Sequence, residues 1–242
     1  MLVSIITVAY NSENTISRTI ESVLNQTYNN IEYIIIDGDS KDNTVKIAEA
    51  YKEKFKNGKI LKIVSEPDDG MYDALNKGIN IADGEIVGSI NSDDWYEPQA
   101  VEKMVDLYLK EKYDVAWGSI RVITSKGSRI KHAKINYFWT TTGWCHPAMF
   151  AKRTILLKYP YVCKNIYDDF NFVTSVYCDN KRIVTLDQVV SNFTFGGMST
   201  QRKLADVWYR SKIKYEIYRD HGMSRLYWFH CLCMELAKYI LG

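Results

Sequence analysis

The sequence predicts an α/β protein with a doubly wound, mostly parallel sheet, flanking helices and a C-terminal helical extension. Over roughly the first 120 residues, short apolar runs rich in β-branched residues alternate with segments of helical length, which favours parallel strands joined by right-handed crossovers. The strand-like runs are almost continuously apolar, as in a sheet covered on both faces. From Thr200 onward the sequence has a helical pattern, and this predicts the extension.

The strands and helices of the first half follow from these runs. Five strands are expected, at Val3–Val8, Ile31–Ile36, Ile60–Val64, Glu85–Ile90 and Asp114–Trp117. Apolar residues spaced three and four apart predict helices around residues 16–24 and 45–51.

The pattern changes after Gly118. A hairpin is predicted from Ile120–Thr124 and Ser128–Lys131, which flank a Lys-Gly turn. A helix near Asp169–Cys178 and a strand near Arg182–Val190 follow, and the C-terminal helical region is expected to break at His221-Gly222.

Composition excludes several classes of protein. The chain has 242 residues, 46% of them apolar, and a net charge of +2, which is too balanced for a nucleic-acid-binding protein. Its five cysteines are odd in number and lack zinc-site spacing, so free thiols in a reducing cytoplasm are expected. There is no signal-like N-terminus and no apolar run of about 18 residues, so we expect a cytoplasmic protein that is soluble or lies on a membrane surface.

Polar residues collect where the first four strands end. The clusters are Ala9–Asn11, Asp37–Ser40, Glu66–Gly70 and Asn91–Asp94. Parallel strands place such clusters along one carboxyl edge, and ligands of open α/β sheets bind there, where the strand order reverses. With the strand order 3-2-1-4, Asn11 and the pair Asp93-Asp94 flank that reversal.

The chemistry of these clusters favours a metal-bridged anion. Several carboxylates that converge on one crevice need a cation or a proton between them. The sequence has neither the glycine-rich dinucleotide loop nor the P-loop. A diphosphate would therefore be held through Mg²⁺ or Mn²⁺, which prefer oxygen ligands and also act as Lewis acids on a leaving diphosphate.

An ordered series of motifs resembles the inverting family 2 glycosyltransferases of the GT-A fold, a Rossmann-like α/β architecture. The matching segments are Ser4–Asn11, Ser22–Thr27, Ile36–Thr44, Ser65–Gly78 and Asn91–Asp94, with weaker similarity at His146–Phe150 and Gly196–Ser199. The resemblance implies a GT-A domain over residues 1–200, with a nucleotide-sugar-binding half (1–118) and an acceptor-binding half (119–200). Residues 201–242 form the extension.

The resemblance also implies a donor site. Its expected residues are Thr7, Ala9, Tyr10, Asn11, Asp37, Asp39, Asp69, Asn76, Ser92 and Asp93. Tyr10 would stack on the base, Asp37 would hydrogen-bond it, and Asp93 would meet the ribose or the metal. Asp94 would coordinate Mn²⁺ or Mg²⁺ directly. The family's Asp-x-Asp motif has Asn91 in its first position here, so the division of labour between Asp93 and Asp94 stays open.

The resemblance places the catalytic base at the start of a later helix. Asp169 is the best match, and Asp168 is the second. Inversion needs one base that takes the acceptor proton while the anomeric carbon is attacked opposite the diphosphate, through a transition state that resembles an oxocarbenium ion. Trp144 and His146 are expected on the acceptor side.

The implied activity is transfer of a sugar from a UDP-sugar to the hydroxyl of a saccharide or a lipid-linked saccharide, in capsule or O-antigen synthesis. Two alternatives remain open. One is a non-catalytic nucleotide-sugar-binding subunit of an assembly complex. The other is a sugar nucleotidyltransferase, which usually has a glycine-rich basic N-terminal loop, unlike residues 9–13.

Structural roles also remain open for the acidic residues. Asp93 and Asp94 are alternatively turn residues ahead of a helix that has Pro98 in its first turn. Asp37 and Asp39 can form an Asx turn, and Asp169 can be a favourable charge at a helix N-terminus. Asp69 and Asn76 suit turn and helix-surface positions, Tyr10 suits sheet-edge packing, and His146 suits a half-buried position.

The extension has two interpretations. Residues 202–225 contain seven basic and three acidic residues, and the aromatic segment Leu226–Phe229 follows. Basic residues beside aromatic ones suit anionic lipid headgroups, which predicts peripheral contact with the inner face of the cell membrane. Alternatively, the helices pack against the catalytic domain or a partner subunit.

Overall fold

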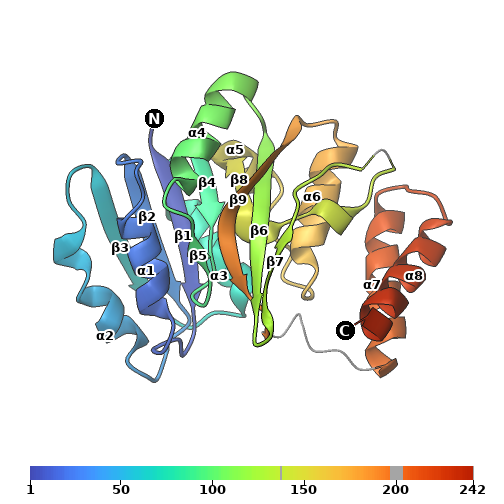
Figure 1. The fold of residues 1–242 in the computed structure, drawn as a ribbon, viewed down its shortest axis with the longest axis horizontal. Coiled ribbons are helices and arrows are strands. Elements are labelled where there is room, and N and C mark those ends of the chain that lie inside the picture. Colours follow the sequence, from blue (N-terminus) through green and yellow to red (C-terminus); the bar gives the residue numbers. More distant parts are fainter. Residues whose placement is uncertain (137, 197–203, 242) are drawn as a thin grey trace.

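A mixed sheet runs through the centre of the molecule (Figure 1). The computed structural model describes residues 1–136, 138–196 and 204–241. Within them the strands are β1 (Val3–Ala9), β2 (Ile31–Asp37), β3 (Lys59–Ser65), β4 (Ile86–Ser89), β5 (Trp95–Tyr96), β6 (Val115–Thr124), β7 (Gly127–Lys131), β8 (Met149–Lys152) and β9 (Ile183–Thr194). Their order is β3-β2-β1-β4-β8-β6-β9-β5, with β7 paired to β6, so the predicted order of the first four strands is confirmed.

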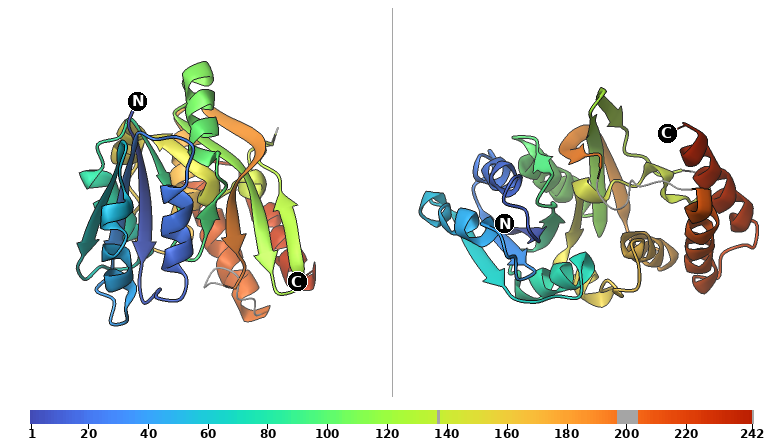
Figure 2. Two further views of the ribbon diagram at one scale, coloured as in Figure 1. Left: turned by 60° about the vertical axis from the view of Figure 1, so that its left-hand side comes forward. Right: turned by 90° about the horizontal axis from the view of Figure 1, so that it is seen from below.

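Helices cover both faces of this sheet (Figure 2). They are α1 (Ile16–Leu24), α2 (Thr44–Glu49), α3 (Met71–Ile81), α4 (Ala100–Glu111), α5 (Arg153–Lys158), α6 (Asp168–Cys178), α7 (Leu204–Asp220) and α8 (Tyr227–Leu241). Helices α1, α2 and α4 lie on one face, and α3, α5 and α6 lie on the other. Every residue of β1 and β2 is buried, which explains why these strands are apolar without alternation.

The second half of the sheet contains antiparallel pairs. Strand β8 lies between β4 and β6 and is antiparallel to both, so the strand expected at Asp114–Trp117 does not neighbour β4. That segment and the segment Ile120–Thr124 form one continuous strand, β6. The prediction of two separate strands in this segment is therefore wrong.

Gly118 explains the error. The register between β6 and β9 shifts on both sides of Ser119, and a Cβ at Gly118 would lie 2.1 Å from Cγ2 of Val190. Glycine therefore permits a bulge and a close approach within the strand, rather than ending it. The expected boundary after residue 118 consequently falls inside β6, and the boundary at residue 200 lies outside the described residues.

The other predicted elements of the second half are present, with one extension and one addition. The hairpin is present as β6 and β7, and the predicted helix near Asp169 is α6. Strand β9 continues beyond the predicted end to Thr194, and its last residues pair with the short strand β5, which the sequence did not indicate. Helix α7 ends before His221-Gly222, and Gly222 has a φ of 73°, a conformation that favours glycine.

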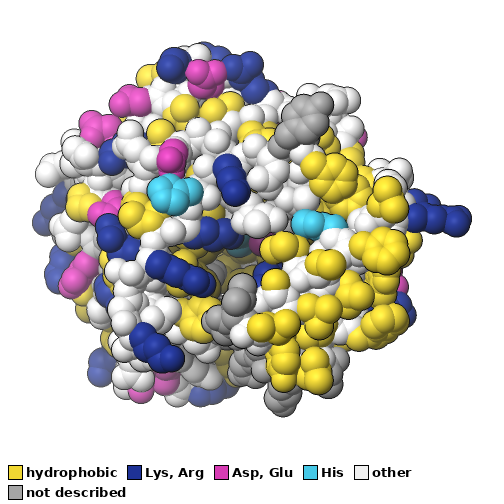
Figure 3. Space-filling view, turned by 45° about the vertical axis from the view of Figure 1, so that its right-hand side comes forward, with side chains coloured by type: hydrophobic (Ala, Val, Ile, Leu, Met, Phe, Trp, Pro, Cys, Tyr) yellow, Lys and Arg dark blue, Asp and Glu magenta, His cyan; other side chains and the backbone are white. Residues whose placement is uncertain are grey.

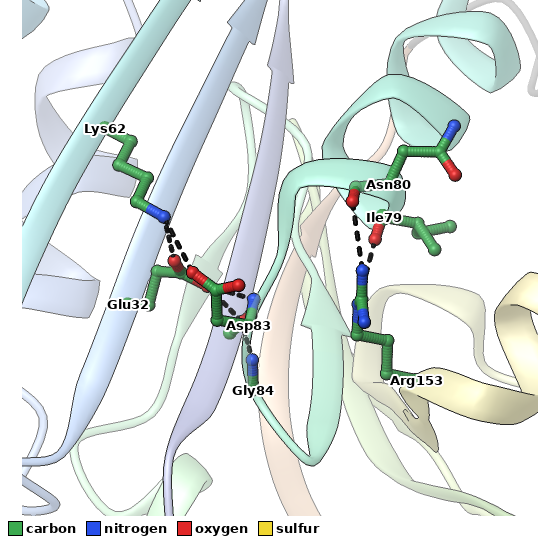
Figure 4. A network of polar contacts seen from close by, with 8 residues as sticks. Glu32, Lys62, Ile79, Asn80, Asp83, Gly84 and Arg153 are labelled. Atoms are coloured by element: carbon green, nitrogen blue, oxygen red, sulfur yellow. Dashed lines mark hydrogen bonds and ion pairs between the residues drawn. The ribbon is translucent and has the colours of Figure 1, made fainter.

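A polar network fixes the amino edge of the sheet (Figure 4). The buried carboxylate of Glu32 accepts hydrogen bonds from Ser4 Oγ, Lys62 Nζ and the backbone N–H of Asp83. Nearby, Arg153 donates to the carbonyls at the end of α3, where cations are favourable. The segment between α3 and β4 is thereby anchored at the edge opposite the polar clusters.

The C-terminal helices pack on each other and on the domain (Figure 1). Between them the carboxylate of Glu235 pairs with Lys214, and with Lys238 at 2.8 Å. Burial lowers the pKa of Lys214 to about 8. The ring of Tyr218 on α7 lies 5.0 Å from that of Phe170 on α6. Packing against the domain is therefore confirmed, and within the described residues no helix is long and apolar enough to span a bilayer.

Candidate active site

The loops after β1 and β2 are joined at the carboxyl edge. Asn11 has a left-handed backbone (φ 47°), its N–H donates to Ser40 Oγ at 2.8 Å, and its Oδ1 accepts from the N–H of Lys41 at 2.9 Å. The N–H of Gly38 donates to the carbonyl of Ala9 at 2.9 Å. Tyr10 is 63% exposed on this edge, so it is free of sheet packing and its ring is available to a ligand.

Asp37 and Asp39 differ in accessibility. Asp37 is fully buried, and it accepts hydrogen bonds from the N–H and Oγ of Ser40 at 2.9 and 2.5 Å and from Ser65 Oγ at 2.7 Å. Its carboxylate thus connects the loops after β2 and β3, through the local hydrogen bonds that Asp makes in turns. Asp39 is half-buried, has a φ of 62° and pairs with Lys41 at 2.5 Å.

The loop after β3 lies against this pair. The carboxylate of Asp68 occupies the space that a Cβ of Gly38 would need, at 2.6 Å, and accepts from the N–H of Gly70 at 2.8 Å. Asp69 is exposed, and its N–H donates to Asp73 Oδ2 at 3.2 Å. The expected donor residue Asp69 therefore presents its side chain to solvent at the start of α3.

Two expected donor residues are engaged elsewhere. Thr7 is fully buried, and its Oγ1 accepts a hydrogen bond from the hydroxyl of Tyr33 at 2.9 Å. The amide of Asn76 donates to the carbonyl of Tyr161 at 2.7 Å and accepts from its N–H at 3.1 Å. The side chains of Thr7 and Asn76 thus support the domain from within, because strand alternation and the helix face turn them away from the carboxyl edge.

The loop after β4 carries the acidic pair. Ser92 Oγ lies 2.8 Å from Ser12 Oγ, which joins this loop to the one after β1. The carbonyl of Asp93 accepts from Arg18 Nη2 and Thr194 Oγ1, both at 2.7 Å, and its side chain is half-buried. Asp94 is fully buried, and its Oδ1 accepts from the N–H of Thr194 at 2.8 Å.

The burial and protonation of the Asp94 carboxyl indicate whether it could bind a metal ion. Its Oδ2 is buried without a hydrogen-bond partner in the described part of the chain. Burial, and then the charge of Asp93, raise the pKa of Asp94 to about 8. Such a carboxyl is stable at neutral pH only when it holds a proton or has a cation beside it. The adjacent carboxylates of Asp93 and Asp94 therefore fit a divalent cation, with Asp93 the more accessible of the two.

The protein alone does not complete such a site. Among residues 1–136, 138–196 and 204–241, no group of three or more His, Cys, Asp or Glu side chains is placed to hold a metal ion. Mg²⁺ commonly takes one or two carboxylates and completes its shell with phosphate oxygens and water. Two aspartates lie within the number of carboxylates that such a site uses.

The second cluster of expected residues surrounds Asp169, in the first turn of α6. Its Oδ2 accepts from Trp144 Nε1 at 3.0 Å, and its Oδ1 accepts from the Tyr72 hydroxyl at 3.1 Å. Asp168 is buried, accepts from the N–H of Lys164 at 3.0 Å, and has its pKa raised by burial. Asp168 therefore closes the loop before α6, and Asp169 is the carboxylate that is presented.

The expected acceptor residues lie beside this carboxylate. Trp144 is buried and packs edge-on against Trp117, with ring centroids 4.9 Å apart. His146 Nε2 lies 3.2 Å from the Tyr161 hydroxyl. Burial lowers the pKa of His146, and the nearby charge of Asp169 opposes this shift. Both residues are thus brought to the candidate base.

Sequence reasoning missed Tyr72, Arg18 and Thr194. Tyr72 lies within the family motif Ser65–Gly78, but its side chain meets Asp169 across 97 residues of chain. Thr194 meets Asp94 across 100 residues. Periodicity and motif spacing do not report contacts at such separations.

Comparison with known proteins decides the family. The family model described as "Glycosyl transferase family 2" matches residues 4–170. This range includes both the acidic pair Asp93-Asp94 and the cluster around Asp169. This chain belongs to glycosyl transferase family 2. It is a glycosyltransferase, as the motif series predicted, and this membership favours glycosyl transfer over the activated-sugar synthesis of a nucleotidyltransferase.

Relatives of this glycosyltransferase include bacterial proteins. It is 32% identical over 187 residues to the E. coli protein named UDP-Glc:alpha-D-GlcNAc-diphosphoundecaprenol beta-1,3-glucosyltransferase WfgD, covering 74% of this chain and 71% of WfgD. It is 39% identical over 111 residues to the chondroitin synthase of Pasteurella multocida. That match covers 46% of this chain but only 11% of the synthase, so the chain spans a small part of that relative.

Solved structures confirm the predicted GT-A fold. S. aureus TarS, residues 1–349, superposes with a TM-score of 0.74 at 18% identity, covering 100% of this chain and 72% of that chain. TarS has also been solved in complex with UDP-GlcNAc, with a TM-score of 0.73. The mannosyltransferase PcManGT from Pyrobaculum calidifontis, in complex with GDP-Man and Mn²⁺, gives 0.69 at 16% identity, covering 98% of this chain and 69% of that chain.

Helix α7 supports the helix that carries Asp169. Residues on both sides of the Asp168-Asp169 pair contact α7 or its end. Lys214 Nζ lies 4.6 Å above the ring of Tyr167, and Phe170 packs on Tyr218. His221 Nε2 lies 3.0 Å from Asn171 Oδ1. The extension therefore fixes the position of the start of α6.

His221 makes this contact sensitive to pH. Burial lowers the pKa of His221, so below about pH 6.5 the unfolded chain binds a proton that the folded chain does not. We expect the melting temperature to fall between pH 7.5 and pH 5.5, and to fall less in His221→Gln. Thermal unfolding at both pH values measures this. His132→Gln, which changes an exposed histidine paired with Asp187, is the control, and equal pH dependence in His221→Gln and wild type would contradict the role of His221.

Proposed function

We propose that this glycosyltransferase moves a hexosyl group from a UDP-sugar to an acceptor hydroxyl with inversion, in the synthesis of a bacterial surface polysaccharide such as capsule or O-antigen. The observation that carries the proposal is the Asp169 carboxylate, held on one oxygen by Trp144 and on the other by Tyr72, which lies in the first turn of the helix after the acidic loop of β3. The TarS complex with UDP-GlcNAc and the UDP-Glc in the name of WfgD support a UDP-sugar. The diphosphoundecaprenol in the name of WfgD supports a lipid-linked saccharide acceptor.

The donor would lie over the loops after β1, β2 and β4. Tyr10 is exposed and its ring is free to stack on a base, and Asp39 and Asp69 stand on the adjoining loops. The other expected donor residues would act indirectly. Asp37 and Ser92 hold the loops together, while Ala9, Asn11, Thr7 and Asn76 shape the backbone beneath them.

We further propose a Mg²⁺ or Mn²⁺ ion held by Asp93 and Asp94, with Asp93 as the accessible ligand. When bound, the metal would neutralise the diphosphate and act as a Lewis acid on its leaving oxygen. The unpartnered Oδ2 of Asp94 and the adjoining carboxylate of Asp93 support this assignment, and Mn²⁺ in the PcManGT complex agrees with it.

Asp169 would act as the general base. It would accept the proton of the acceptor hydroxyl while that oxygen attacks the anomeric carbon on the face opposite the diphosphate. His146 and Trp144 lie beside the carboxylate, so they would border the acceptor. Asp168, which is buried, would hold the loop before α6 instead of sharing the proton transfer.

Metal-dependent donor binding is the first test. Wild type should bind UDP more tightly than GDP or ADP, and only with Mn²⁺ or Mg²⁺, because the carboxylates repel the diphosphate without a cation. Asp93→Ala and Asp94→Ala should each weaken UDP binding at least ~10-fold, in line with the loss of a metal ligand. Calorimetric titration measures this, with Asp106→Ala on α4 as the control. UDP affinity that is unchanged by chelator would refute the metal assignment.

Loss of the base is the second test. Asp169→Asn keeps the shape of the carboxylate but cannot take a proton, so we expect at least a ~100-fold loss of transfer with unchanged UDP binding. UDP release from UDP-glucose or UDP-N-acetylglucosamine, with a synthetic sugar-diphospholipid as acceptor, measures this. Asp168→Asn is the matched neighbour and should keep more activity than Asp169→Asn. Equal rates in Asp169→Asn and wild type would remove the base assignment and favour a nucleotide-sugar-binding subunit.

The C-terminal helices would rest on the inner face of the cell membrane. Exposed apolar side chains at 229, 233 and 240 repeat at helical spacing along α8, and exposed Leu226 lies just before this helix. Trp208 and Tyr209 add to them from α7. The opposite side of α8, with Tyr227, Cys231 and Glu235, is buried. Figure 3 shows a large apolar area beside a hollow in the surface. Such an apolar face near basic residues suits an anionic bilayer.

Vesicle flotation tests this contact. Wild type should float with vesicles of phosphatidylglycerol and phosphatidylethanolamine, and Phe229→Ser with Ile240→Ser should lose most of this binding because it removes the apolar anchors. Leu109→Ser, which changes a similarly exposed side chain on α4 (56% against 64% for Phe229), is the control. Absence of wild-type flotation would leave packing against the domain or a partner as the role of these helices.

A further inference from the structure

We infer that Tyr72 and Trp144 are positioning residues, which hold one oxygen each of the Asp169 carboxylate so that it faces the acceptor hydroxyl in a fixed orientation. This inference rests on the proposed role of Asp169 as the base. It gives Trp144 a role on the base in addition to its place beside the acceptor, and it gives Tyr72 a role that the motif series does not imply.

The geometry supports an orienting role. Trp144 Nε1 is 3.0 Å from Oδ2, and the Tyr72 hydroxyl is 3.1 Å from Oδ1. The last torsion of an Asp side chain is broad, so a carboxylate with one donor can still turn. Donors on both oxygens fix that torsion. A carboxylate oxygen accepts more than one hydrogen bond, so the acceptor hydroxyl can still approach.

The two donors are themselves held in place. The ring of Tyr72, in the first turn of α3, stacks on Tyr161 with centroids 5.1 Å apart. Trp144 packs against Trp117, whose Nε1 donates to the carbonyl of Gly143 at 2.7 Å. Both Tyr72 and Trp144 are buried. Neither donor can follow a carboxylate that moves, so they define its position.

Tyr72 also has a second acceptor. Its hydroxyl lies 3.2 Å from the carbonyl of Ile166, and its single proton can point to that carbonyl or to Asp169. Burial, together with the charge of Asp169, raises the pKa of Tyr72 far above its usual value, so the phenol keeps its proton. It therefore serves as a donor that turns and not as an acid.

This arrangement satisfies Asp169 before and after transfer. In the reaction the acceptor O–H bond breaks, its oxygen bonds the anomeric carbon, and the C–O bond electrons leave with the diphosphate. The acceptor proton passes to the carboxylate of Asp169. Once Oδ1 carries that proton, it can donate to the Tyr72 oxygen while the Tyr72 hydroxyl turns to the carbonyl of Ile166. The buried groups thus keep hydrogen bonds in both states.

Two single variants and a matched control test the inference. Tyr72→Phe keeps the stack on Tyr161 and removes the hydroxyl, and Trp144→Phe keeps an aromatic ring against Trp117 and removes the N–H. Tyr113→Phe removes a buried tyrosine hydroxyl that donates to the carbonyl of Met104 at 3.1 Å. UDP release from UDP-glucose or UDP-N-acetylglucosamine with Mn²⁺, with the synthetic sugar-diphospholipid as acceptor, is followed from pH 5 to pH 9. Thermal unfolding confirms that each variant is folded.

We expect kcat to fall about 10-fold in each variant, a part of the factor that a general base supplies, with KM for the UDP-sugar unchanged. The acid limb of the pH–rate profile should move to higher pH, because the ionised carboxylate loses a donor that favours it. Tyr113→Phe should match wild type. A purely structural role would not move this limb.

The outcomes separate the two proposals. If Asp169→Asn is inactive while both folded variants keep the wild-type kcat and pH profile, the positioning role is overturned and the base assignment stands. If only KM for the UDP-sugar changes, the positioning role is overturned as well. If Asp169→Asn itself keeps full activity, the proposed function fails at the base. If one variant does not fold, the other still decides the inference.

Discussion

Parallel pairing of β1 with both β2 and β4 is the constraint on which the rest of the structure depends. Strand β1 is hydrogen-bonded on both sides and buried on both faces, so its direction fixes where its neighbours end. These parallel strands therefore all end at the same edge of the sheet. The loops that follow them there carry the polar residues, which the apolar core cannot accommodate. The amino edge is closed by the Glu32 network, which leaves the carboxyl edge as the place for the site.

A second regularity lies in the acidic pairs. In each pair one carboxyl is buried and holds backbone or hydroxyl donors, while its neighbour is more accessible. The buried members are Asp37, Asp94 and Asp168. A buried carboxylate persists only with hydrogen bonds, a proton or a cation, so these three organise their loops. Their partners Asp39, Asp93 and Asp169 are half-buried, which makes them the groups that can meet a donor, a metal or an acceptor.

The C-terminal helices α7 and α8 also have one surface that packs on the domain and another that is exposed. Helix α7 contacts residues on both sides of the Asp168-Asp169 pair, through Lys214, Tyr218 and His221. The same two helices expose an apolar stripe on their outer side. One surface of the extension therefore steadies the helix that carries the candidate base, while the other is available for a bilayer. The two interpretations made from the sequence are compatible, because they concern different surfaces of the extension.

The sequence by itself determined the parallel first half, the edge at which its polar loops gather and the family, because these follow from periodicity and from motifs contiguous in the chain. Only the tertiary structure decided that β8 lies between β4 and β6, which aspartate of each pair is buried, and that Trp144 and Tyr72 meet Asp169. These outcomes depend on contacts such as Thr194 with Asp94, 100 residues apart. Local spacing carries no record of such contacts, because they arise when separate elements pack against one another.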